Sequence, residues 1–252
     1  MKISIVTAVF NRADTIEDAL ASVQIQRYAP VEHVIQDGGS TDGTLDIIKA
    51  QGAAATHLVS EPDGGIYDAI NKGISRASGD VVGLMHSDDM FASRDVLSKV
   101  AAAFSSPDVD GVYGDLTYVA AEDHARVIRY WSAGDYSSEK LSRGWMPPHP
   151  TLYLRRHVFE RWGLYNTNYR IAADYDAMLR YLLKGRIRLA YIPEVFVRMR
   201  VGGESNKTVR HILRKSREDY QAIRQNGAGG FGTLALKNVR KIGQFVSKEP
   251  ET

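Results

Sequence analysis

The chain contains no cysteine among its 252 residues. This absence excludes disulfide bonds, a thiolate nucleophile and cysteine-ligated zinc or iron–sulfur centres. A long apolar run is also missing, because no stretch reaches the roughly 20 residues that a membrane-spanning helix needs. The apolar segment that begins at Ile3 is too short for a secretory leader and has no small-residue cleavage site. We therefore expect neither a membrane span nor a leader.

Glycine-rich phosphate loops are absent as well. The dinucleotide fingerprint needs glycines directly after the first strand, where this chain has Thr7-Ala8-Val9-Phe10-Asn11-Arg12. No Gly-x-x-x-x-Gly-Lys-Ser/Thr sequence occurs, which argues against a P-loop NTPase.

The net charge is only +2, but it is unevenly distributed. Residues 203–252 hold ten Lys and Arg against five Asp and Glu, which leaves the rest of the chain slightly acidic. A basic segment on a near-neutral body favours contact with an anionic surface, although a solvated helical pair has the same composition.

The first half of the sequence repeats a strand–helix pattern. Short β-branched runs predict strands, and apolar residues at helical spacing predict the helices between them. The expected strands span residues 2–9, 31–36, 56–60 and 81–85, and the expected helices span residues 14–26, 42–50, 66–75 and 96–104. We expect Asp14 and Asp42 to begin helices, and Ile66, Ile70 and Ile74 to face the core. Repeated βαβ units predict a parallel sheet covered by helices.

The second half indicates longer strands and a helical end. Residues 111–119 and 126–131 predict strands that could pair antiparallel, residues 151–155 predict an edge strand, and residues 188–199 predict a strand broken at Pro193. Helices are expected at residues 174–183, 209–225 and 233–246, the last two separated by the glycine-rich residues 227–232.

Carboxylates follow two of the expected parallel strands. Asp88 and Asp89 come directly after the strand at 81–85, and Asp37 follows the strand at 31–36. Burying an unpaired ionised carboxylate is costly, so we expect these groups at the carboxyl edge of the sheet, where open α/β sheets bind ligands. Asp88 and Asp89 could instead begin a helix, and Asp37 could form a turn.

Four segments, in this order and spacing, resemble family 2 glycosyltransferases of the GT-A fold. They are Thr7–Arg12, Gln36–Thr44, Glu61–Gly73 and Ser87–Asp89. The resemblance is specific over residues 1–105, looser to about 205, and closest to bacterial members that build surface polysaccharides or glycolipids. It implies an α/β fold, a GT-A nucleotide-binding α/β/α sandwich with a mixed central sheet.

The same resemblance implies that the chain consists of two parts. Residues 1–205 would form the glycosyltransferase domain, with a nucleotide-sugar-binding half at 1–105 and an acceptor and catalytic half at 106–205. Residues 206–252 would form a basic C-terminal helical extension.

The resemblance also implies a nucleotide-diphosphate sugar as donor and inversion at the anomeric carbon. Asp88 and Asp89 would hold the ribose and a divalent cation, Mn²⁺ or Mg²⁺. Asp37 would bind the base, and the resemblance adds Thr7, Ala8, Phe10, Asn11 and Asn71 as donor-binding residues. Lys72, which shares a helix face with Asn71, is a further candidate. Arginine suits phosphate recognition, so Arg200, with Arg198 as a weaker candidate, could close over the diphosphate, or both could be exposed arginines on an edge strand.

Two positions depart from the family pattern. His86 stands two residues before Asp88 where many members have an acidic residue, and Ala173 stands where a glutamate precedes the catalytic aspartate. A single displacement needs a general base for the acceptor hydroxyl, a role that the resemblance assigns to Asp174, with Asp176 as second choice. Without the resemblance, Asp174 could equally be a helix N-cap. His149, in a proline-rich loop, could shape the acceptor site or ligate metal.

The acceptor implied by the resemblance is a glycan or a lipid-linked sugar. The last expected helix is amphipathic and basic, which favours an anionic membrane surface. It carries Leu236, Val239, Ile242 and Val246 together with Lys237, Arg240, Lys241 and Lys248. We expect a cytoplasmic protein, peripheral on the inner face of the cell membrane, without a nucleic-acid partner. The alternatives are a non-catalytic sugar-nucleotide-binding protein and a sugar-phosphate nucleotidyltransferase.

Overall fold

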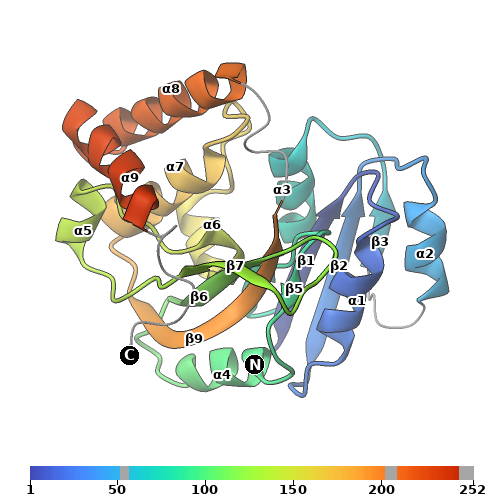
Figure 1. Ribbon diagram of the computed structural model, residues 1–252. Helices are drawn as coiled ribbons and strands as arrows, with labels where there is room; N and C mark the ends of the chain where they lie inside the picture. Colours follow the sequence, from blue (N-terminus) through green and yellow to red (C-terminus); the bar gives the residue numbers. More distant parts are fainter. Residues whose placement is uncertain (52–56, 202–208, 244–252) are drawn as a thin grey trace.

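The computed structural model describes residues 1–51, 57–201 and 209–243. A curved mixed sheet lies between helical layers, which confirms the expected α/β fold (Figure 1). The strands are β1 (Ile3–Val9), β2 (Val31–Asp37), β3 (His57–Ser60), β4 (Val81–Leu84), β5 (Met90–Phe91), β6 (Gly111–Val119), β7 (Val127–Trp131), β8 (Tyr153–Arg155) and β9 (Leu189–Arg200). The helices are α1 (Ile16–Gln24), α2 (Thr44–Ala50), α3 (Ile66–Arg76), α4 (Val96–Ala103), α5 (Ser138–Ser142), η1 (His149–Thr151), α6 (Arg156–Trp162), α7 (Ala173–Leu179), η2 (Arg180–Lys184), α8 (Val209–Gln225) and α9 (Phe231–Gly243).

The first half is a parallel four-strand unit in the order β3-β2-β1-β4. Its strands are in register, since Val9 lies opposite Asp37 and Asp37 lies opposite Ser60. The loops that follow these strands therefore gather at one edge of the sheet. This is where the sequence places its polar motifs.

The second half is antiparallel where it joins the first. β8 pairs antiparallel with β4 on one side and with β6 on the other, so the prediction of an edge strand here is wrong. The fully buried ring of Tyr153 explains its position, because a Cβ at Gly83 would lie only 2.3 Å from that ring. Only glycine on β4 leaves room for this close packing.

β9 crosses Pro193 without ending. Gly114 of β6 lies opposite Ile192, but the next residue, Asp115, lies opposite Val195. Pro193 and its neighbour Glu194 are exposed and fall in this irregularity, where a residue without an N–H group costs no ladder hydrogen bond. The expected break is therefore a bulge within one long strand.

Three local expectations need correction. The residue that precedes α1 is Thr15 rather than Asp14. Ile66 is half exposed, because it is the first residue of α3 and lies beyond the sheet, whereas Ile70 and Ile74 are buried as expected. Helices α5 and α6 were not expected. Asp42 does bind the backbone N–H of Thr44 at 3.0 Å, although Gly43 is the residue that directly precedes α2.

The C-terminal helices pack against the second half. α8 lies against α7, and the ion pair of Asp219 with Lys237, at 2.6 Å and fully buried, joins α8 to α9. Lys237 also lies 3.3 Å from the ring centre of Tyr175. The expectation that Lys237 belongs to an exposed basic face is therefore wrong. Val246 and Lys248 lie outside the described residues. In the described part of the chain, no helix is long and apolar enough to cross a membrane.

Candidate active site

The loop after β2 is folded around the carboxylate of Asp37, which is fully buried. Oδ2 accepts hydrogen bonds from the backbone N–H groups of Gly39 and Ser40, at 2.9 and 3.0 Å, and from Ser60 Oγ at 2.6 Å. Oδ1 accepts one from Ser40 Oγ. This carboxylate thus holds the turn in shape, and its expected contact with the base stays a prediction.

The loop after β1 is built in a similar way. Asn11, at a positive φ of 50°, accepts a hydrogen bond from Thr41 N at 2.9 Å and so ties this loop to the one after β2. The Thr7 hydroxyl is fully buried against His33 Nε2 at 2.9 Å. Ala8 is half-buried, whereas Phe10 is 55% exposed at the strand end. Phe10 is thus the side chain of this loop that presents the most surface to a ligand.

Helix α3 contacts the second half of the molecule through hydrogen bonds of Asn71. The side chain of Asn71 donates to Tyr165 O at 2.8 Å and accepts from Tyr165 N at 2.9 Å. Lys72 donates to Pro62 O at 3.0 Å and lies 3.4 Å from both Glu61 and Asp68. The amide of Asn71 is therefore fully engaged with the backbone, and Lys72 borders the loop after β3.

The two aspartates after β4 differ sharply in environment. Asp88 is half-buried, and within the described part of the chain its carboxylate makes no hydrogen bond. Asp89 is fully buried, accepts one hydrogen bond from Arg200 N at 3.3 Å, and leaves Oδ2 without a partner. Burial, reinforced by the charge of Asp88, raises the pKa of Asp89 well above its ordinary value. Asp88 is the carboxylate open to a cation or a sugar hydroxyl.

The two arginines of β9 lie in different environments. Arg200 is buried, and its guanidinium is bound to Asp18 of α1 and to His124 Nε2, the latter at 2.9 Å. Arg198 is exposed. Arg200 therefore ties the end of β9 to α1 and to Asp89, and its expected diphosphate contact stays a prediction.

Two histidine rings lie close together between the two halves of the molecule. The rings of His86 and His149 are centred 6.0 Å apart, and His149 Nε2 lies 2.9 Å from the Tyr165 hydroxyl. Burial lowers the pKa of His149 to about 4 and also lowers that of His86. Both imidazoles are therefore neutral near pH 7. The negative charges of Asp88 and Asp174 oppose the shift at His86, which places His86 near both carboxylates.

Asp174 lies in the first turn of α7, beside the ring of Tyr67. Its Oδ1 accepts from Tyr175 N at 2.8 Å and lies 3.3 Å from the Tyr67 hydroxyl. Directly before the helix, Glu218 of α8 accepts from Ile171 N at 2.8 Å and from Ala172 N at 3.1 Å. Asp174 is half-buried and does not serve as the N-cap, which leaves it available for chemistry.

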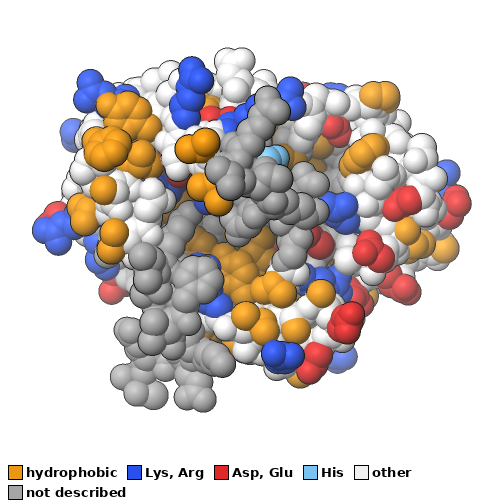
Figure 2. Space-filling model, turned by 45° about the horizontal axis from the view of Figure 1, so that its top comes forward, with side chains coloured by type: hydrophobic (Ala, Val, Ile, Leu, Met, Phe, Trp, Pro, Cys, Tyr) orange, Lys and Arg blue, Asp and Glu red, His pale blue; other side chains and the backbone are white. Residues whose placement is uncertain are grey.

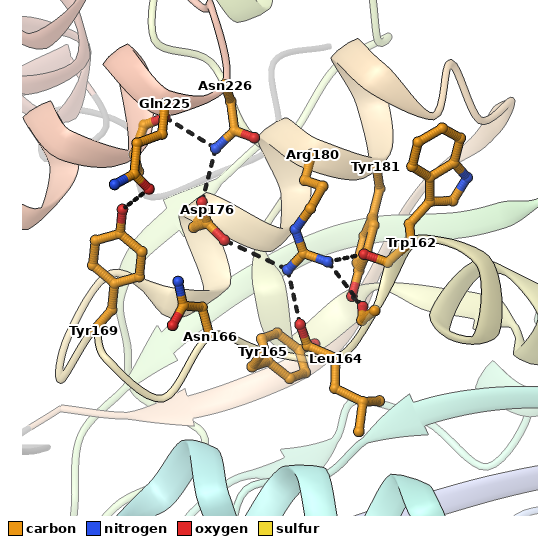
Figure 3. A network of polar contacts seen from close by, with 12 residues as sticks. Trp162, Leu164, Tyr165, Asn166, Tyr169, Asp176, Arg180, Tyr181, Gln225 and Asn226 are labelled. Atoms are coloured by element: carbon orange, nitrogen blue, oxygen red, sulfur yellow. Dashed lines mark hydrogen bonds and ion pairs between the residues drawn. The ribbon is translucent and has the colours of Figure 1, made fainter.

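Asp176 belongs to a structural network (Figure 3). It accepts from Asn226 Nδ2 at 2.8 Å and lies 3.5 Å from Arg180 Nη2. Arg180 in turn donates to the carbonyl groups of Gly163 and Leu164, at 2.9 and 2.8 Å. The buried carboxylate of Asp176 thus ties α7 to the end of α8 and to the loop after α6.

Sequence reasoning did not identify Tyr67, Tyr165 or Glu218 as parts of this site. Tyr67 falls inside the segment Glu61–Gly73 that carries the resemblance, so a signal for it existed. Tyr165 and Glu218 reach the site only through packing, and their local sequence carries no comparable signal. Within the described residues, no group of three or more His, Asp or Glu side chains could hold a metal ion by itself.

Comparisons with known proteins show the family to which the chain is similar. A family model described as "Glycosyl transferase family 2" matches residues 4–163. A PGL/p-HBAD biosynthesis glycosyltransferase of Mycobacterium bovis is 32% identical over 181 residues, which cover 70% of this chain and 68% of that protein.

Solved structures share the fold. The mannosyltransferase PcManGT from Pyrobaculum calidifontis, in complex with GDP-Man and Mn²⁺, superposes with a TM-score of 0.68 at 19% identity, covering 97% of this chain and 72% of that one. Residues 1–349 of Staphylococcus aureus TarS, in complex with UDP-GlcNAc, give a TM-score of 0.66 at 19% identity, covering 90% of this chain and 65% of that one.

Proposed function

The chain belongs to glycosyl transferase family 2 and is a glycosyltransferase, and on that premise we propose that it is an inverting enzyme with a nucleotide-diphosphate sugar as donor. The observation that carries the proposal is a pair of half-buried carboxylates that the fold leaves accessible: Asp88 after β4 accepts no hydrogen bond within the described residues, and Asp174 in the first turn of α7 is not the N-cap of its helix. Asp88 would anchor the donor, and Asp174 would take the proton from the acceptor hydroxyl as it attacks the anomeric carbon. The nucleotidyltransferase alternative lacks both a family match and a phosphate loop.

The donor class is supported by the fold relatives. PcManGT was solved with GDP-Man, and TarS with UDP-GlcNAc. We therefore propose GDP- or UDP-linked sugars as donors here. The acceptor that we propose is a glycan or lipid-linked hydroxyl, because the mycobacterial relative is named for glycolipid (PGL) biosynthesis.

A divalent cation fits the residues present. Mg²⁺ and Mn²⁺ prefer oxygen ligands and are commonly held by one or two carboxylates together with substrate phosphates. Asp88, whose carboxylate accepts no hydrogen bond from the described residues, would supply such a ligand. Asp89 is buried, and its carboxylate accepts a hydrogen bond from Arg200 N at the end of β9. When bound, the cation would neutralise charge on the leaving diphosphate.

The donor anchor is tested with Asp88→Asn. UDP or GDP with Mn²⁺ should raise the melting temperature of the wild type by several degrees, because a ligand that binds only the folded state stabilises it. The variant should lose the part of the rise that depends on Mn²⁺. Asp108→Asn, at an exposed carboxylate paired with Arg188, is the matched control and should respond like the wild type. A wild-type rise that is the same with and without Mn²⁺ would contradict the proposed cation.

We further propose that α8 and α9 rest on an anionic membrane surface. Ile212 and Leu213 of α8 and Phe231 of α9 are 54, 67 and 75% exposed, and Arg214 and Arg217 beside them are also exposed. Figure 2 shows hydrophobic side chains gathered next to Lys and Arg on this side of the molecule, at its upper left. Apolar and basic side chains on one helical surface suit the boundary between lipid headgroups and acyl chains.

A further inference from the structure

The segment that leads into α7 is held by side chains from two other helices. Glu218 of α8 accepts hydrogen bonds from the backbone N–H groups of Ile171 and Ala172, at 2.8 and 3.1 Å. The hydroxyl of Tyr67, on α3, donates to the carbonyl group of Ile171 at 2.7 Å. The N–H and the C=O of Ile171 are therefore both bound by side chains that lie far from it in sequence. Asp174 follows three residues later.

The same hydroxyl of Tyr67 reaches the carboxylate of Asp174. Its oxygen lies 3.3 Å from Asp174 Oδ1, which also accepts from Tyr175 N at 2.8 Å. Burial, reinforced by the charge of Asp174, raises the pKa of Tyr67 well above its ordinary value. The hydroxyl therefore keeps its proton at neutral pH and remains a donor. One side chain of the first half thus contacts both Asp174 and the backbone that leads to it.

Glu218 supplies the corresponding contact from the C-terminal helices. Its side chain is buried, and a carboxylate is costly to bury unless it is hydrogen-bonded. Here a single oxygen, Oε2, accepts from two successive backbone N–H groups at the point where α7 begins. Hydrogen bonds to a carboxylate are stronger than those between neutral groups. Because α8 lies beside α7 (Figure 1), this contact fixes the start of α7 relative to α8.

We infer that Tyr67 and Glu218 are positioning residues that hold residues 171–174 so that Asp174 faces the acceptor hydroxyl. The inference deepens the proposed function and rests on it, because it requires Asp174 to be the general base. A general base must lie within hydrogen-bond reach of the proton that it removes, and a misplacement of about 1 Å can slow a reaction by about 10²-fold. Loss of either support should therefore slow the chemical step without weakening donor binding.

The experiment measures kcat, the KM for the donor and the melting temperature of three variants, with the UDP- or GDP-linked sugar that the wild type transfers. Tyr67→Phe removes only the hydroxyl, and Glu218→Met keeps the length of the side chain but has no oxygen. Each should lower kcat by about tenfold or more and change the donor KM by less than about twofold. Glu218→Gln retains an oxygen that can accept from both N–H groups, so its kcat should recover to within about threefold of the wild type.

Two matched controls make similar changes at side chains that do not bind residues 171–174. Tyr181→Phe removes a hydroxyl that donates to Gly163 O at 2.7 Å. Gln225→Met removes the oxygen that accepts from the Tyr169 hydroxyl at 2.8 Å, which is another bond between α8 and the loop before α7 (Figure 3). Both controls should keep kcat near that of the wild type, even where the melting temperature falls.

The same substitutions are then made together with Asp174→Asn. Residues that act through Asp174 should change the residual rate of Asp174→Asn by less than about twofold, because the group that they position is already lost. If Glu218→Met does not fold, Tyr67→Phe decides alone, since its ring can still stack on Tyr165. The inference is overturned if Tyr67→Phe and Glu218→Met keep kcat near that of the wild type while Asp174→Asn loses it, or if they slow both backgrounds equally. Transfer by Asp174→Asn near the wild-type rate would overturn the proposed function and the inference together.

Discussion

At the scale of single residues, the protein buries polar groups whose bonding partners are already in place. Glu32 accepts from Lys2, Ser4 and Ser78 and has its pKa lowered to about 2. Two other buried groups, His33 and His149, have their pKa lowered to about 4 because burial disfavours the charged imidazole. These histidines make the stability of the fold depend on pH.

Stability should fall as the pH drops below about 6.5. In that range the unfolded chain binds protons at both histidines, whereas the folded chain resists protonation down to about pH 4. Each histidine should cost about 2 kcal/mol between pH 7 and pH 5. Urea unfolding at the two pH values measures this loss, and His33→Gln should reduce it by about 2 kcal/mol. An equal loss in wild type and variant would show that His33 does not resist protonation in the folded state.

The sequence predicted local features of the site better than long-range ones. The motifs that contain Asp37, Asp63 and Asp88 lie at strand ends as expected, because parallel strands bring their carboxyl ends together. What each side chain does there depends on neighbours distant in sequence. Arg200 is bound to Asp18, far away along the chain, and no local pattern indicates that pairing.

At the scale of elements, helices and strands were predicted well in type but less well in placement. β8 is short, and only the ring of Tyr153 under Gly83 shows why it lies inside the sheet. β9 continues beyond Pro193 because its pairing with β6 has a bulge at this residue. α9 has the expected amphipathic pattern, yet Lys237 faces inward because Asp219 on α8 supplies a buried partner.

The surface of α8 and α9 provides a prediction for these elements. Replacing both Leu213 and Phe231 by Gln should lower partitioning onto vesicles of anionic lipid by at least tenfold, since each buried apolar side chain contributes about 1.5–3 kcal/mol. Sedimentation with vesicles measures the effect. The control is Ile25→Gln, at an exposed isoleucine that follows α1. If the double variant and the control bind vesicles equally well, this surface does not contact lipid.

At the scale of the whole molecule, one continuous sheet and a shared hydrophobic core join the two halves, and polar contacts between them fix the position of Asp174. The side chain of Asn71 on α3 forms two hydrogen bonds with the backbone of Tyr165. The hydroxyl of Tyr67, on the same helix, lies 3.3 Å from Asp174 Oδ1. Glu218 of α8 binds the backbone N–H groups of Ile171 and Ala172, directly before α7. The position of Asp174 relative to the donor loops therefore depends on the first half, the second half and the C-terminal helices together.

The central claim, that Asp174 is the general base of sugar transfer, is tested most directly by the rate of transfer in Asp174→Asn. The account predicts a fall of about 10²–10⁴-fold in kcat, with the affinity for UDP or GDP and the melting temperature close to those of the wild type. Glu139→Gln, at an exposed carboxylate on α5, should retain full activity. Transfer by Asp174→Asn at a rate near that of the wild type would contradict the account.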